Sequence, residues 1–518
     1  MSGLAWFGMV AAIVGAVIMS AWWLLRQSRR AILSWYGQAS ERTLDRFKEH
    51  IEPFKLTRRT EVHEQLMADS VIQDAIRTHA AEHDMSPGAT NREVERYIRE
   101  IVPFFNVLSY YHLGYSISRF LISMLYRVRI TTRDSQAAKQ IPSGDVVVYL
   151  MNHRSNADYV VVAFVLSGTV SISYAVGEWA RTWPLEFVFK SFGSYFIRRR
   201  YRVPLYHAVL ERYVQLITRN GVTQGIFPEG GLTRDGRLLP PKLGLLDYLV
   251  RTKTDPRFTG DIWLVPVGIN YDRVLEDRTL IQERIIGSRP RGKLRQFWSV
   301  IHYLTRNVLR LALGRFQQYG EVAVAFGSPM SVRRWLDENG PNILSLPKAQ
   351  RLSRMERLAQ EALDQVGAVV PVTPVPLAAA ALLHSGTSAT TEAQVLARMD
   401  ELRDMLLRAN AVVGDPEATT VQLWERAWRI LRMRRLVVRE GATLIILPRQ
   451  RPLLEYYANS IGHLLSEAQR ITMTPAAESD ETLPRLARRD EMSINTGSYS
   501  APNTPEGRPV DRDRLERR

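Results

Sequence analysis

Residues 149–158 read YLMNHRSNAD and close an apolar, strand-like run with a cluster of polar side chains. The apolar residues 159–166 follow at once. His153 and Asp158 stand five positions apart, which is about 140° around a helix, so a helix would not place them on one face. A turn between a strand and a helix would bring them together. This stretch therefore predicts an α/β fold with a polar site where a strand ends.

The pair has a specific chemical use. A carboxylate on one imidazole nitrogen fixes the tautomer and leaves the other nitrogen free to take a proton from a hydroxyl group. We therefore predict His153 as a general base and Asp158 as the residue that orients it. The alternative is that both side chains only cap the turn. No metal site is predicted, because no further cluster of His, Asp or Glu lies close by in sequence.

The surrounding residues, 128–340, alternate β-branched runs with helical stretches. This pattern predicts an α/β domain with a mixed sheet flanked by helices. Ligands gather at the strand ends of such sheets, which is where the polar residues stand. The predicted strands are residues 145–151, 171–175, 225–227, 262–268 and 321–326.

A second block, residues 193–200, reads GSYFIRRR. The guanidinium fork matches a phosphate with two parallel hydrogen bonds, so Arg198 and Arg199 are candidates for an anion clamp. The alternative is a plain solvated surface.

A third block, residues 225–231, reads GIFPEGG. Proline and two glycines after a strand predict a tight turn, and Gly230 would let a ligand approach the backbone. Glu229 either binds a substrate hydroxyl, holds a neighbouring arginine, or accepts hydrogen bonds from the amides of the turn.

A fourth block, residues 264–273, reads LVPVGINYDR. Pro266 disfavours a regular ladder at its position. The segment is either a wall of an acyl pocket or a plain core strand.

These four blocks, in this order and at these intervals, resemble the glycerolipid acyltransferase family with its H-x-x-x-x-D motif. The FIRR run at residues 196–199, the INYDRV run at 269–274 and the LLEYYAN run at 453–459 are similar to the glycerol-3-phosphate and dihydroxyacetone-phosphate branch. The resemblance implies general-base catalysis by His153 with Asp158, no bound cofactor, no metal and no covalent intermediate. It also implies that Arg198, Glu229 and Gly230 bind substrate, and we add Arg199.

One position departs from the family pattern. The arginine that often follows the third block is Leu232 in this chain. We expect Arg234 to replace it in binding the acceptor, which leaves the identity of the acceptor open.

The chain has 518 residues, a formal charge of +16 and no cysteine. The charge implies an anionic partner, and the absence of cysteine excludes disulfides and thiolate chemistry. Residues 4–25 are largely apolar, and about 22 residues at 1.5 Å each would cross a bilayer. The alternative is a signal peptide, but because arginines follow directly, we expect a single-pass N-terminal anchor with the catalytic domain on the cytoplasmic side.

The predicted organisation has five parts: an anchor at 1–26, a helical membrane-proximal region at 27–127, the acyltransferase domain at 128–340, a mostly helical region at 341–469 and a disordered tail at 470–518. Residues 284–315 carry eight basic and no acidic side chains, interleaved with aromatic ones, which suits an anionic lipid surface better than nucleic acid. Residues 368–383 are either a buried helix or a membrane-surface contact. Residues 435–447 predict a hairpin.

The expected function is glycerol-3-phosphate acyltransferase activity that forms lysophosphatidate. The expected partners are glycerol 3-phosphate, membrane lipids and an acyl donor, which is an acyl thioester of coenzyme A or of acyl carrier protein. Dihydroxyacetone phosphate or lysophosphatidate is the alternative acceptor. A protein of another class, a silent lipid-binding scaffold, is disfavoured because the histidine and the aspartate are both present.

Overall fold

The computed structural model describes residues 53–105, 115–132, 141–166, 171–181, 185–199, 201–286, 318–384 and 389–465. All of them belong to one compact unit, Met1–Met473. The predicted tail and most of the basic segment 284–315 lie outside the described residues. The domain boundaries given above stay a prediction.

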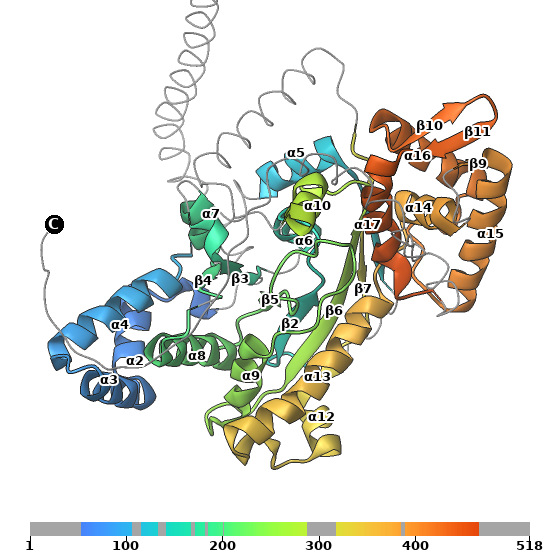
Figure 1. Cartoon of the computed structure of the whole chain (residues 1–518). Coiled ribbons are helices and arrows are strands. Elements are labelled where there is room, and N and C mark those ends of the chain that lie inside the picture. Colours follow the sequence, from blue (N-terminus) through green and yellow to red (C-terminus); the bar gives the residue numbers. More distant parts are fainter. Residues whose placement is uncertain are drawn as a thin grey trace, which may run out of the picture. The chain divides into compact units, whose positions relative to one another are not determined.

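A mixed sheet with eight strands forms the centre of the described residues (Figure 1). The strand order is β1-β7-β6-β2-β5-β3-β4, and β8 pairs with β6. Pairing is parallel except where β6 meets β7 and β8. The strands are β1 Arg127–Thr132, β2 Val146–Met151, β3 Ser173–Gly177, β4 Tyr195–Ile197, β5 Gln224–Ile226, β6 Ile262–Tyr271, β7 Glu321–Phe326 and β8 Met330–Ser331.

The predicted α/β class with a mixed sheet and flanking helices is confirmed. All five predicted strands exist, with shifts of a few residues at their ends. The prediction missed β1, β4 and β8. β1 is an edge strand with the polar sequence RVRITT, and β4 and β8 have only three and two residues, so none shows a sustained apolar run.

Pro266 lies inside β6 at a gap in its antiparallel pairing. The strand pairs with β8 at Trp263 and Leu264 and with β7 from Val267 onward. The proline therefore stands where β6 changes partner, and there its missing N–H costs little.

Two apolar cores cover the sheet, and β2 contributes to both by period-2 alternation. Val146, Val148 and Leu150 belong to the core under α8, α9 and α13, whereas Met151 belongs to the core under α5, α6, α14 and α17. α13 packs along β6, as Figure 1 shows. The helices of these two layers are α5 Tyr115–Leu125, α6 Asp158–Leu166, α8 Pro204–Arg219, α9 Gly244–Val250, α13 Lys348–Ala368, α14 Pro374–His384 and α17 Arg451–Gly462.

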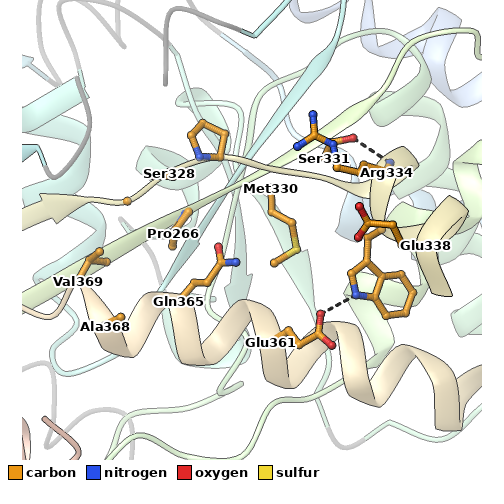
Figure 2. A pocket seen from close by; sticks show the side chains of 13 residues that line it. Pro266, Ser328, Met330, Ser331, Arg334, Glu338, Glu361, Gln365, Ala368 and Val369 are labelled. Atoms are coloured by element: carbon orange, nitrogen blue, oxygen red, sulfur yellow. Dashed lines mark hydrogen bonds between the residues drawn. The ribbon is translucent and has the colours of Figure 1, made fainter. Parts of the chain in front are cut away.

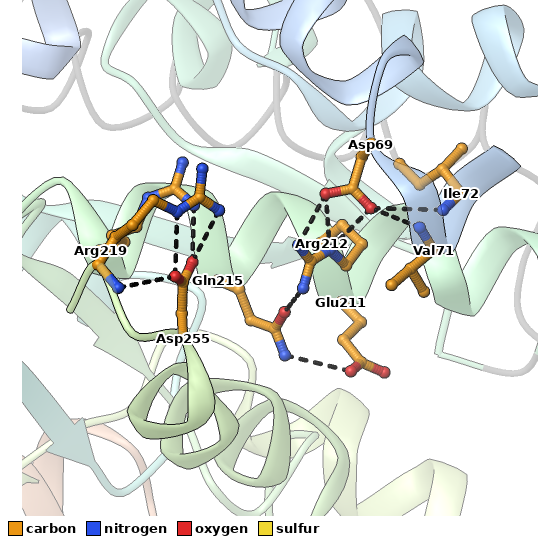
Figure 3. A network of polar contacts seen from close by, with 9 residues as sticks. Asp69, Val71, Ile72, Glu211, Arg212, Gln215, Arg219 and Asp255 are labelled. Carbon is orange, nitrogen blue, oxygen red and sulfur yellow. Dashed lines mark hydrogen bonds and ion pairs between the residues drawn. The ribbon is translucent and has the colours of Figure 1, made fainter.

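The remaining helices are α2 Arg59–Met67, α3 Ser70–Glu82, α4 Pro87–Ile101, α7 Leu185–Ser191, α10 Asp277–Ile286, α12 Val332–Asn339, α15 Glu392–Arg408 and α16 Thr420–Met433. α3 packs on α8, and one carboxylate ties the two helices together. Asp69 accepts from the amides of Val71 and Ile72 at the start of α3 and also from the guanidinium of Arg212 on α8, with N···O distances of 2.7–2.9 Å to the arginine (Figure 3). Asp69 thus caps the N-terminus of α3 and also holds this helix against α8.

The C-terminal part confirms two expectations. α14 is buried along residues Pro374 to Leu383, which decides for the buried helix over the surface contact. The predicted hairpin consists of β10 Val437–Glu440 and β11 Thr443–Ile446, with Gly441 at φ 61° in the turn. β9 Ala389–Thr391 adds a third, unpredicted strand.

The described helices contradict the prediction of a single-pass anchor and the membrane localisation that depends on it. No helix within the described ranges is both long and apolar enough to cross a bilayer. α13 has 21 residues but is rich in charged side chains, and α14 is apolar but has only 11, about 16 Å of the roughly 30 Å required. Residues 4–25, on which the anchor was predicted, lie outside the described residues. The predicted localisation therefore has no support from the structure.

Candidate active site

The turn between β2 and α6 brings His153 and Asp158 together. β2 ends at Met151 and α6 begins at Asp158. Nδ1 of His153 lies 2.9 Å from Oδ2 of Asp158, and the two residues are 1% and 0% exposed. The strand-to-helix turn predicted from the spacing of these residues is present.

The Asp158 carboxylate is held from several sides. Oδ2 also accepts from the amides of Arg154 at 2.8 Å and Ser155 at 3.0 Å, and Oδ1 accepts from the hydroxyl of Tyr271 at 2.6 Å. Four donors on one buried carboxylate fix its orientation. Since Oδ2 is an acceptor, the imidazole carries its hydrogen on Nδ1 and leaves Nε2 unprotonated.

The electrostatic surroundings keep the imidazole of His153 neutral. Burial lowers the pKa of His153 below its usual value, the Asp158 carboxylate raises it, and the Arg199 guanidinium lowers it further. The net direction is downward. Near neutral pH the side chain is therefore a free base with one nitrogen committed to Asp158.

The third block supports the same histidine. The two Glu229 oxygens accept from the amides of His153 and Leu239, each at 2.8 Å. Burial raises the pKa of Glu229 to about 7, against these two donors. The Phe227 ring stacks on the imidazole at 4.1 Å between centroids. Glu229 therefore accepts from two backbone amides outside its own turn, and its use as a substrate ligand stays a prediction.

The two arginines of the second block point to different places. The Arg198 guanidinium pairs with Glu100 of α4 and lies over the ring of Tyr201 at 4.7 Å. Arg199 is exposed, and no acidic side chain of the described residues pairs with it. A Cβ built on Gly177 would meet the Arg199 guanidinium at 3.1 Å, and one built on Gly231 would meet it at 3.9 Å. Arg199 thus lies between the end of β3 and the third-block turn.

Gly230 and Arg234 differ in their surroundings. Gly230 has φ 68°, and a Cβ there would lie 2.9 Å from Cγ of Lys242, so the turn requires glycine. The Arg234 side chain is 55% exposed and pairs with Glu283 of α10 at 3.2 Å. Leu232, which stands at the position of the family's arginine, packs against the apolar core. The structure therefore brings His153, Asp158, Glu229 and Arg199 together, while Arg198 and Arg234 are engaged with other residues.

Two segments of the chain match models of known protein families. Residues 132–270 match the family model described as acyltransferase, and residues 305–474 match that of the glycerol-3-phosphate acyltransferase C-terminal region. Over these two segments the chain is similar to the glycerol-3-phosphate acyltransferase branch of the acyltransferase family.

Curated relatives named glycerol-3-phosphate acyltransferase occur in several bacteria. The protein from Aeromonas hydrophila is 29% identical over 80% of this chain and 51% of its own length. Those from Pseudoalteromonas translucida and Alteromonas mediterranea are 25% and 24% identical, over 83% and 79% of this chain and 53% and 50% of their own. The chain spans about half the length of these relatives.

A solved structure is also similar in part. The 1-acyl-sn-glycerophosphate acyltransferase PlsC from Thermotoga maritima is 17% identical, with a TM-score of 0.27, over 52% of this chain and 82% of its own.

Several residues of the candidate site escaped the sequence analysis. Tyr271 stood within a run already quoted, but its contact with Asp158 depends on β6 lying beside β2. Glu276 accepts from Oγ of Ser155 at 2.7 Å, across 121 positions of sequence. Lys242 is exposed beside Gly230 and has no ion-pair partner within the described residues. The PPK run at 240–242, directly after the third-block loop, was the one available signal.

A separate cavity of about 460 Å³ lies between β6, β8, α12 and α13 (Figure 2). Pro266 contributes to its wall, together with Met330, Trp335 and Val369, and the first three blocks contribute no residue. Nε1 of Trp335 donates to Glu361, and both residues line the cavity. The cavity is thus distinct from the His153 turn. No group of three or more His, Asp or Glu side chains that could hold a metal ion occurs in the described part of the chain.

Proposed function

We propose that this protein is a glycerol-3-phosphate 1-O-acyltransferase that moves a fatty acyl group from a thioester to glycerol 3-phosphate and forms lysophosphatidate. The observation that carries this proposal is the buried His153–Asp158 pair at 2.9 Å, in a chain whose C-terminal region matches that of glycerol-3-phosphate acyltransferases. The curated relatives are named glycerol-3-phosphate acyltransferase, which supports glycerol 3-phosphate as the acceptor.

The geometry suits direct transfer by general-base catalysis. Nε2 of His153 takes the proton of the acceptor hydroxyl as its oxygen attacks the thioester carbonyl carbon. The tetrahedral intermediate then collapses, the carbon–sulfur bond breaks, and the leaving thiolate takes the proton from Nε2. Asp158 stabilises the imidazolium in between, because its carboxylate is 2.9 Å from Nδ1. No covalent enzyme intermediate is needed, and the thioester supplies the acyl group.

The acceptor phosphate would lie against Arg199, Lys242 and the third-block turn. Arg199 and Lys242 flank Gly231 and Gly230, and neither has an acidic partner within the described residues. Two unpaired cations beside a glycine turn provide charge and open backbone for a phosphate. Arg198 would act indirectly, since it holds Glu100 and the second block in place. We place Arg234 at the rim of the proposed phosphate site, because its exposed side chain is already paired with Glu283.

One assay tests the proposal. The purified 518-residue chain is offered labelled glycerol 3-phosphate, dihydroxyacetone phosphate or lysophosphatidate, each with acyl-coenzyme A and with acyl carrier protein thioester. We expect transfer to glycerol 3-phosphate and its loss in His153→Ala. His83→Ala is the matched control. His83 is the C-cap residue of α3, and the variant should keep full activity. Transfer to none of the acceptors, or full activity of His153→Ala, would refute the mechanism.

A further inference from the structure

Arg154, the neighbour of His153, is buried with its charge. It is 2% exposed, and its guanidinium donates to three backbone carbonyls. Nη1 lies 2.7 Å from the oxygen of Gly236, Nη2 lies 2.9 Å from that of Ser460, and Nε lies 3.3 Å from that of Ile269. Gly236 lies in the loop that follows the third block, Ser460 lies in α17 and Ile269 lies in β6. We call residues 232–239 the third-block loop.

This arrangement is costly for a residue that serves packing alone. Burying a guanidinium costs free energy unless it is well paired, and an apolar side chain of similar volume is often as stable. Arg154 has no carboxylate among its hydrogen-bond partners in the described residues, and burial lowers its pKa. What the guanidinium provides is a fixed fork that joins three segments next to the catalytic histidine.

α17 contacts the same third-block loop through other residues. Nδ2 of Asn459 donates to the carbonyl of Asp235 at 2.9 Å. Gly236 has φ 84°, and a Cβ there would lie 1.8 Å from the carbonyl oxygen of Tyr456, so helix and loop are in direct backbone contact. The loop in turn reaches the catalytic turn, because the amide of Thr233 donates to the carbonyl of His153 at 3.2 Å.

We propose that α17 sets the position of residues 233–236 against the His153 turn, and that Arg154 and Asn459 are the positioning residues through which it does so. The inference rests on the proposed function for its kinetic readout. In this arrangement α17 touches no substrate and acts only through residues 233–236. The loop and the histidine keep their spacing only while α17 is docked.

The test compares variants of these two residues with matched controls in the full-length protein. Arg154→Met and Asn459→Ala remove the contacts, and Arg154→Lys retains the charge. Arg351→Met is the control for a buried arginine, since Arg351 pairs with Asp247 away from the site. Asn220→Ala is the control for an asparagine that donates to a backbone carbonyl. The readouts are kcat, KM for glycerol 3-phosphate, the thermal unfolding midpoint, and hydrogen exchange of residues 231–239.

A shift of about 1 Å can cost about 100-fold in rate, so we expect a loss of that order in kcat for Arg154→Met and about 10-fold for Asn459→Ala. Exchange of residues 231–239 should rise in both variants. The double variant should lose no more than about twofold beyond Arg154→Met, because both act through one loop. Arg154→Lys should recover part of the activity. The controls should lower only the unfolding midpoint.

The inference is overturned if Arg154→Met and Asn459→Ala lower the unfolding midpoint as the controls do while kcat and loop exchange stay unchanged. Should Arg154→Met fail to fold, Asn459→Ala and Arg154→Lys decide by the same criteria. If the wild-type protein transfers no acyl group, the proposed function fails, and the exchange of residues 231–239 alone decides whether α17 positions the loop.

Discussion

The hydroxyl of Tyr271 donates to Oδ1 of Asp158 at 2.6 Å, on the side of the carboxylate opposite to His153. Tyr271 ends β6, and Asp158 begins α6. The parallel pairing of β2 with β6 brings these two positions together. The orientation of the proposed base therefore depends on a strand 113 positions further along the chain.

We expect Tyr271→Phe to lower kcat by about 10-fold. The change removes one hydrogen bond to a buried, charged acceptor, which is worth about 1.5–3 kcal/mol, and frees the carboxylate to rotate away from the imidazole. KM for glycerol 3-phosphate should change little, since the phosphate is bound elsewhere. Steady-state kinetics measures both. Tyr213→Phe, on the buried face of α8, should keep wild-type kcat, and equal rates in the two variants would contradict the role given to Tyr271.

The pH dependence of kcat/KM should show an acid limb with its midpoint below pH 6.5. Protonated His153 cannot accept the hydroxyl proton, so activity falls as pH drops through its pKa in the folded protein. Burial lowers that pKa below the usual histidine value of 6.5. Below pH 6.5 His153 binds a proton in the unfolded chain but not in the folded chain. This residue therefore also makes the protein less stable as pH falls below 6.5. A midpoint at or above 6.5 would contradict the assignment of the limb to His153.

Asp158→Asn should lower kcat by about 10³- to 10⁴-fold, as seen when the carboxylate behind a catalytic histidine is replaced in hydrolases. An amide cannot accept from four donors on two oxygens, so the variant favours the wrong imidazole tautomer. Asp247→Asn, which affects the buried pair with Arg351, is the control for a lost buried carboxylate. It should reduce stability while kcat of the folded fraction stays within about twofold. A loss smaller than 10-fold in Asp158→Asn would leave the pair without a catalytic role.

The sheet could be predicted where strands are long and apolar. β2, β6 and β7 are recognisable as largely apolar runs, and their residues are buried or half-buried because both faces of a central strand are covered. β1 could not be found this way, because polar residues interrupt its sequence RVRITT, and β4 has only three residues. The turn with His153 and Asp158 was predictable because both partners lie in one local segment.

The rest of the site depends on distant partners. Nothing in FIRR separates Arg198 from Arg199, because Glu100, 98 positions earlier, takes the first and leaves the second beside Gly231. The three carbonyls bound by Arg154 lie 82, 115 and 306 positions away. Such contacts follow from how helices and strands pack, which the spacing of residues does not show.

Arg199→Ala should raise KM for glycerol 3-phosphate by about 10- to 100-fold with a smaller change in kcat, because a charge-assisted contact to phosphate is made in the ground state and the transition state alike. Arg198→Ala should mainly lower stability, since it breaks a pair with a buried carboxylate that Arg181 also contacts. Kinetics and thermal unfolding of the two variants distinguish the roles. A larger rise in KM for Arg198→Ala would reverse the assignment.

The contacts of Asp69 at the start of α3 allow a prediction that concerns stability alone. In Figure 3 one carboxylate, that of Asp69, serves both the first turn of α3 and Arg212 of α8. Asp69→Ala removes the cap and the partly exposed ion pair, which together contribute about 1–3 kcal/mol. Asp69→Asn keeps an oxygen for the cap and should lose about half of that. We expect faster hydrogen exchange of α3 in the order Ala, Asn, wild type, and unchanged kcat in both variants. Equal exchange in the alanine and asparagine variants would mean that the cap contributes nothing and that the ion pair alone holds the helix.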